Sequence, residues 1–148
     1  MPRPVLLGAS FAVGIIAGIL GTALHGNIWV IGDVESGLVL PWGALLSLLL
    51  LLMLVLWAGT TEGSLTAPTL LGASAFTVAT AAYVWPGPDQ LVVPFSPLAF
   101  DTLPGPVIAS LVWWLGSAGI TLVGLIAVRW IITADAARTR QRAAGADR

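Results

Sequence analysis

The stretch Leu38–Trp57 reads LVLPWGALLSLLLLLMLVLW and contains no charged residue. An apolar run of about 20 residues is long enough for a helix to cross the hydrocarbon layer of a bilayer. Trp42 and Trp57 bracket the leucine-rich part, as aromatic residues do at the two interfaces of a membrane-spanning helix. Pro41 falls within the first turn, where its missing N–H costs little. The stretch therefore predicts a membrane-spanning helix with much of its surface facing lipid.

The composition of the whole chain also indicates a membrane protein. Of the 148 residues, 57% are hydrophobic and 9% are charged, and the mean hydropathy is +0.97. Soluble domains carry about 25% charged residues, so the polar surface of a water-soluble fold is missing here. The chain contains no cysteine, which excludes a disulfide framework and a cysteine-ligated metal.

Three further apolar stretches predict three more helices. The predicted spans are residues 5–24, 38–57, 65–85 and 107–132, the outer loops are 25–37 and 86–106, and a cytoplasmic tail covers 133–148. The link Ala58–Ser64 is so short that the second and third spans are expected to be antiparallel neighbours. We predict an all-α polytopic membrane protein of one domain, residues 1–148, with four transmembrane helices in an antiparallel bundle.

The first span allows two interpretations. The span has a basic start and an apolar core, which is typical of a cleaved signal peptide. Gly21 begins a weak small-x-small cleavage site after this core. The apolar run is longer than the roughly 7–15 residues of a signal core, however, and it contains Gly14 and Gly18 in a Gly-x-x-x-Gly pattern. Glycines at this spacing let a second helix backbone approach closely. We favour a retained helix, with Gly14 and Gly18 as possible partner contacts.

The third span and the second outer loop differ from the other segments in composition. In the third span, Ala73, Thr77 and Ala81 are four residues apart, which predicts a helix buried among others. The loop 86–106 is rich in proline, which we take to exclude a regular helix or a central strand. It is also apolar, so we expect it to lie extended on the membrane surface or to cap the bundle.

The charged residues predict the orientation. The basic residues lie at the two ends of the chain, with Arg3 near the start and the others at Arg129 and beyond. The two outer loops contain no basic residue but carry carboxylates, Asp33, Glu35, Asp89 and Asp101. The positive-inside rule therefore predicts a multi-pass protein of the inner (plasma) membrane, with both termini in the cytoplasm.

Few residues could carry chemistry. An ionisable residue deep in a span would be a functional candidate, and we find none, because Arg129 is close enough to its helix end to reach the headgroups. His25 could be a metal ligand, a proton shuttle or a quinone contact, or simply a polar residue that ends a helix, and we favour the last. We therefore expect no enzymatic activity, no cofactor, no metal and no nucleic-acid partner.

The remaining candidates are contact residues. Trp113 and Trp114 point in different directions on a helix, so at least one contacts a helix, a lipid tail or a prosthetic group, and we favour packing in the core. The tail arginines Arg138, Arg140 and Arg142 either touch anionic lipids or only mark topology. With Gly14, Gly18 and Trp113, they are the possible partner or lipid contacts.

The layout of four spans and an arginine-rich tail ending TRQRAAGADR resembles that of small uncharacterised four-span membrane proteins of high-GC actinobacteria. The resemblance implies a bundle in the plasma membrane and carries no site residue over. From the residues, we expect a non-catalytic accessory or assembly subunit of a larger membrane complex, which contacts the lipid bilayer and a membrane-protein partner or a second copy. The alternative is a small oligomeric transporter, channel or lipid-handling protein with a polar path along the third span.

Overall fold

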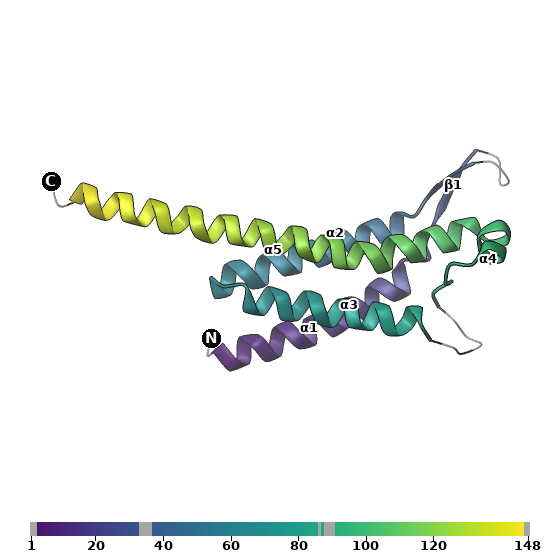
Figure 1. Ribbon diagram of the computed structural model, residues 1–148, viewed down its shortest axis with the longest axis horizontal. Helices are drawn as coiled ribbons and strands as arrows, with labels where there is room; N and C mark the ends of the chain where they lie inside the picture. The colour runs from purple at the N-terminus through teal and green to yellow at the C-terminus, as the bar shows by residue number, and fades with distance from the viewer. Residues whose placement is uncertain (1–2, 33–36, 86, 88–90, 147–148) are drawn as a thin grey trace.

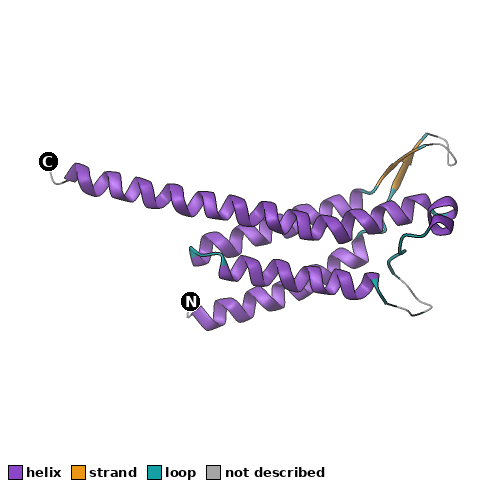
Figure 2. Cartoon of the chain, in the orientation of Figure 1, coloured by secondary structure: helices purple, strands orange, loops and turns teal. Residues whose placement is uncertain are grey.

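The structure is a computed structural model, and it describes residues 3–32, 37–85, 87 and 91–146. This part of the chain is mostly helical, with one short hairpin (Figure 1, Figure 2). The elements in chain order are α1 (Arg3–Leu24), β1 (Trp29–Ile31), β2 (Leu38–Leu40), α2 (Trp42–Glu62), α3 (Thr66–Tyr83), α4 (Pro97–Thr102) and α5 (Pro104–Ala146).

The four long helices form one bundle. Helix α1 packs against α3 and α2, and α5 packs against α2 and α3, while α2 also contacts α3. The predicted antiparallel contact between the second and third helices is thus confirmed. Figure 1 shows that α1 begins and α5 ends at the same end of the bundle, which we name the terminal end. The hairpin and α4 lie at the other end, the hairpin end.

Within the part of the chain that the structure describes, three helices are long and apolar enough to cross a membrane: α1, α2 and the part of α5 from Pro104 to Ala144. Their length and composition support the prediction of a helical membrane protein. Helix α3 has 18 residues, and its alanines and threonines dilute its hydrophobicity, so it is not one of these three.

The second predicted span is displaced in the structure. The predicted start at Leu38 is wrong, because Leu38–Leu40 forms β2 and pairs antiparallel with β1. Pro41 explains the change, since a proline favours an extended conformation in the residue before it, and the helix begins directly after it. The helix also continues past Trp57 to Glu62 and ends at Gly63, whose φ of +66° suits glycine. The predicted turn of Ala58–Ser64 is therefore mostly helix.

The expectation that proline excludes a helix from residues 86–106 is also wrong. Pro97 occupies the first turn of α4, where no N–H is needed, and the Ser96 hydroxyl accepts a hydrogen bond from the N–H of Ala99. Helix α5 then begins at Pro104, three residues before the predicted span.

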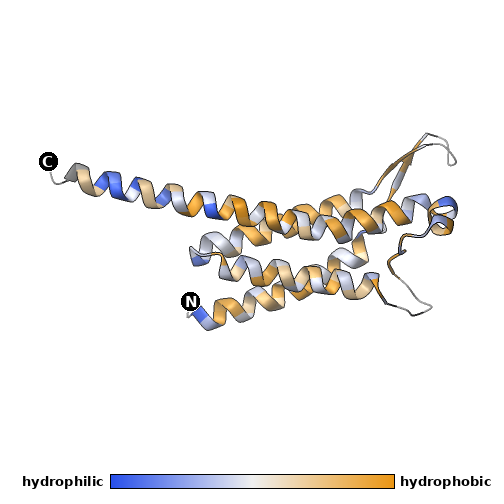
Figure 3. Cartoon of the chain, viewed as in Figure 1, coloured by the Kyte–Doolittle hydropathy of each residue, from blue (hydrophilic) through white to orange (hydrophobic). Residues whose placement is uncertain are grey.

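Helix α5 extends far beyond the predicted fourth span. Its 43 residues correspond to about 64 Å at 1.5 Å per residue, twice the thickness of a hydrocarbon layer of about 30 Å. The predicted tail after Ile132 continues the helix to Ala146, as expected for residues with high helix propensity such as alanine, arginine and glutamine. Figure 3 shows several hydrophilic residues along this projecting part, and others at the start of α1 and at α4.

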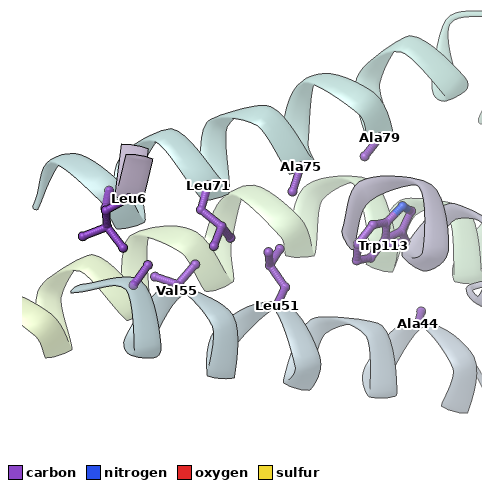
Figure 4. Close-up of a cluster of buried hydrophobic side chains, with 10 residues drawn as sticks. Leu6, Ala44, Leu51, Val55, Leu71, Ala75, Ala79 and Trp113 are labelled. Atoms are coloured by element: carbon purple, nitrogen blue, oxygen red, sulfur yellow. The ribbon is translucent and has the colours of Figure 1, made fainter. Parts of the chain in front are cut away.

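The core lies along the bundle axis and is mostly apolar, with buried hydroxyls such as those of Ser47, Ser74 and Ser117 among the apolar side chains. Figure 4 shows Leu6, Leu51, Leu71 and Trp113 converging between the helices. The close approach of α1 to α3 depends on glycine, because a Cβ at Gly18 would lie 2.9 Å from the carbonyl oxygen of Ala75. The prediction that glycines of the first helix admit a second helix backbone is confirmed, and α3 is that helix.

Candidate functional site

A polar cluster lies at the hairpin end of the bundle and centres on His25, the residue that follows α1. The side chain is buried, and its Nδ1 hydrogen-bonds to the backbone carbonyl of Thr22. Its Nε2 lies 3.3 Å from the hydroxyl oxygen of Ser110 on α5. Because a carbonyl can only accept, we assign the ring proton to Nδ1, and Nε2 then accepts from the Ser110 hydroxyl.

Ser110 extends this hydrogen-bonded chain to the proline-rich segment. Its hydroxyl oxygen accepts from the N–H of Val93 at 3.0 Å, and the serine is 1% exposed. The end of α1, the first turns of α5 and the segment before α4 are therefore joined by consecutive hydrogen bonds through His25 and Ser110. Each of these buried polar side chains has a partner, which lowers the cost of their burial.

Trp113 and Trp114 stabilise the same end of the bundle from α5. The Trp113 indole N–H donates to the Thr22 hydroxyl at 3.1 Å, and its ring fills the space left by the missing side chain of Gly21. Trp114 points another way, as predicted, and donates to the hydroxyl of Thr80 at 3.1 Å. Its ring stacks on Tyr83 with 4.2 Å between the ring centroids. Trp113 is thus a core residue, which agrees with the favoured interpretation.

A serine beside a histidine is a pair that can support nucleophilic catalysis, but here its surroundings differ from those of an active site. Ser110 is buried inside the bundle, and the partner of the second ring nitrogen is a backbone carbonyl instead of a carboxylate. No known family, curated protein or solved structure matches the chain. The contacts of His25 and Ser110 connect α1, α5 and the proline-rich segment.

The electrostatics of His25 agree with a neutral ring. Burial lowers the pKa of His25 below its ordinary value of 6.5, and the hydrogen bond to the Thr22 carbonyl opposes this effect. The ring nitrogens are both engaged within the protein. Within residues 3–32, 37–85, 87 and 91–146, no group of three or more histidine, cysteine or acidic residues could hold a metal ion.

The other predicted contact residues lie apart from this cluster. Gly14 and Gly18 are buried against α3 of the same chain, so a partner could reach them only by displacing α3. Arg138, Arg140 and Arg142 are exposed on the part of α5 that projects from the terminal end. On this helix Arg138 and Arg142 share a face and Arg140 lies opposite. Arg138 also lies 3.4 Å from Asp135, one turn earlier.

The sequence did not reveal a second polar contact at the terminal end. Glu62, at the end of α2, lies 3.3 Å from Arg3 and accepts a hydrogen bond from the N–H of Ala67 at 2.7 Å. It therefore caps the first turn of α3 and ties that turn to the start of α1. The sequence showed only that Glu62 is a carboxylate shortly before a predicted helix. The contact with Arg3 could not be predicted, because it depends on how three helices pack.

Proposed function

We propose that this chain is a non-catalytic integral membrane protein that serves as an accessory or assembly subunit of a larger membrane complex. The observation that carries the proposal is the filling of the bundle axis. Leu51, Val55, Leu71 and Trp113 meet there from three helices and are each at most 1% exposed. A closely packed interior of mostly apolar side chains supports a role in which the protein contributes surfaces to a complex.

The hydroxyl groups of α3 support this proposal over a transporter. Thr69 donates to the carbonyl of Leu65, and Thr77 donates to that of Ala73 in the same helix. Ser74 donates within its own helix and to Phe11 of α1, and Thr80 accepts from Trp114. The hydroxyls of Thr69 and Thr77 are thus satisfied within α3 and need no outside partner, and those of Ser74 and Thr80 join α3 to α1 and α5. In a channel, they would line a wet path.

We further propose that α3 is the fourth membrane span and that both termini are cytoplasmic in the plasma membrane. Helix α3 contacts α1, α2 and α5, so its weaker hydrophobicity is compensated by neighbours that shield it from lipid. The even number of crossings agrees with the arginines at the terminal end. On this layout alone, we place the chain among the small four-span membrane proteins of high-GC actinobacteria.

The topology is tested by single cysteines in this cysteine-free chain. Asp101→Cys on α4 should react with a membrane-impermeant maleimide on intact cells, whereas Ser64→Cys should react only after permeabilisation. Asp101 is exposed and Ser64 is half-buried in the short turn between α2 and α3, so neither substitution changes the packed core. Labelling of Ser64→Cys on intact cells would overturn the orientation.

The function is tested by affinity purification from native membranes in a mild detergent, followed by quantitative mass spectrometry. We expect one integral membrane protein in fixed stoichiometry that stays bound through size-exclusion chromatography. An unrelated four-span protein with the same tag is the control for adventitious capture. As a second control, the membranes are mixed with isotope-labelled membranes from cells without the tagged protein before solubilisation. Labelled protein in the eluate then reveals any association that formed after lysis. A chain that elutes alone, or only with itself, would overturn the proposal.

The second candidate is a small oligomeric lipid-handling protein, transporter or channel, and one observation favours the lipid-handling form. A groove of about 210 Å³ between α1 and α2 is lined by Ala17, Gly21, Leu50 and Met53, and its walls are almost entirely apolar. Leu50 and Met53 are exposed, so the groove opens on the side of the bundle. Transfer of fluorescent lipid between vesicles by the purified chain would support this candidate.

A further inference from the structure

The hairpin end carries apolar side chains that the bundle leaves uncovered. We define the apolar cap as the hairpin strands β1 and β2 with residues 91–103, which include α4. Leu91 and Leu98 are 73% and 74% exposed, and none of the α4 residues is buried. Further exposed apolar side chains of the cap are Trp29, Val30, Ile31, Leu38, Phe95, Phe100 and Leu103.

We propose that the apolar cap is immersed in the boundary between headgroups and acyl chains of the outer leaflet, where it binds phospholipid. The first argument is the distribution of the exposed side chains. In the hairpin, Trp29 and Ile31 lie on one face and Val30 on the other, and all three are exposed. A protein partner covers one face of such a unit. Lipid molecules at the boundary, in contrast, contact both faces of the hairpin.

The second argument is that three backbone donors in residues 91–103 bond to side-chain hydroxyls. The N–H groups of Val93, Phe95 and Ala99 donate to the hydroxyls of Ser110, Tyr83 and Ser96 respectively. The prolines at positions 94 and 97 have no N–H to satisfy. Because an unpaired backbone N–H is costly away from water, this pattern suits a segment placed in a water-poor region. A loop in bulk water would not require it.

The third argument is depth. Helix α2 has 21 residues, or about 31 Å at 1.5 Å per residue, which already matches the hydrocarbon thickness of about 30 Å. The cap adjoins the start of this helix at Trp42, so it lies at the level of the headgroups. Trp29 packs against Trp42 at the start of α2 with 5.6 Å between ring centroids. Tryptophans favour this depth, because their rings are apolar and their N–H groups are polar.

The proposal is tested by depth measurement on the full-length chain in vesicles of phosphatidylethanolamine and phosphatidylglycerol. A nitroxide on Leu98→Cys should collide with oxygen, which concentrates in lipid, several-fold more than with a water-soluble nickel chelate. Ser64→Cys at the terminal end should show the opposite preference. Asp101→Cys is the matched control on α4, and its label should lie closer to water than that at Leu98.

Two outcomes would overturn the proposal. If the nickel chelate relaxes the nitroxide at Leu98→Cys as strongly as the one at Ser64→Cys, the cap lies in water. Shielding from both reagents would indicate a contact with protein. Ile31→Cys gives an independent measurement on the hairpin if the α4 variant fails to fold. The inference rests on the proposed topology only for the choice of the outer leaflet. The experiment measures the depth of the label and gives the same result on either side of the membrane. The depth of the cap and the topology of the chain can therefore fail separately.

Discussion

Gly18 sets the distance between α1 and α3, and its effect can be isolated. A methyl group at this position would meet the side chain of Val78 and the carbonyl of Ala75, whereas one at Gly8 of the same helix would meet nothing within 4 Å. We expect Gly18→Ala to destabilise the bundle by about 1–3 kcal/mol through overpacking. Gly8→Ala should leave stability unchanged or slightly raised. Unfolding in mixed micelles of increasing sodium dodecyl sulfate measures both, and equal effects would contradict the assigned interface.

His25 should make stability depend on pH in a defined direction. Since burial lowers its pKa in the folded state below 6.5, the unfolded chain binds the proton at higher pH than the folded chain does. Its contribution to stability is therefore complete above about pH 6.5 and is lost as the pH falls towards the folded pKa. Thermal unfolding in detergent between pH 8 and pH 5 measures the loss. His25→Gln does not titrate, so it should flatten the dependence of stability on pH. An unchanged dependence in this variant would assign the effect to other groups.

At the scale of elements, Glu62 joins the starts of two helices through two different interactions. Glu62→Gln would remove the ion pair with Arg3 but keep an acceptor for the N–H of Ala67, whereas Glu62→Ala would remove both. Because Arg3 is largely exposed, the ion pair contributes at most about 1 kcal/mol. The lost cap in Glu62→Ala should cost about 1 kcal/mol more. Equal stabilities of the two variants in chemical unfolding would show that the cap contributes nothing.

The existence of the long helices could be predicted from the sequence, as could the end of α1 at Leu24, whereas the ends of α2 and α5 could not. Apolar runs and tryptophan positions are local signals, so they placed all four helices. The start of α2 depended on Pro41 holding Leu38–Leu40 extended against β1, and this strand is hidden in the sequence because its apolar residues run on into the apolar helix. The contact of His25 with Ser110 spans 85 positions, so only the packed bundle brings the two together.

At the scale of the whole molecule, the projecting part of α5 should be separable from the bundle. It extends past the ends of the other helices (Figure 1), and the arginines on it are exposed. We therefore expect that truncation after Thr133 changes the free energy of unfolding by no more than about 0.5 kcal/mol, as other surface changes do. A large loss of stability would show that the extension packs on the bundle. Co-purification of the proposed partner with the truncated chain tests whether the extension takes part in assembly.

The unbroken course of α5 has a mechanical consequence. The same helix passes through the bundle, carries Trp113 and Ser110 in its first turns, and emerges at the terminal end as about 20 Å of helix beyond Thr133. The chain has no hinge between the two parts, because a continuous ladder of backbone hydrogen bonds connects them. Because α5 is unbroken, a tilt at the hairpin end would move the arginine-bearing tip at the terminal end by a distance that grows with the length of the helix.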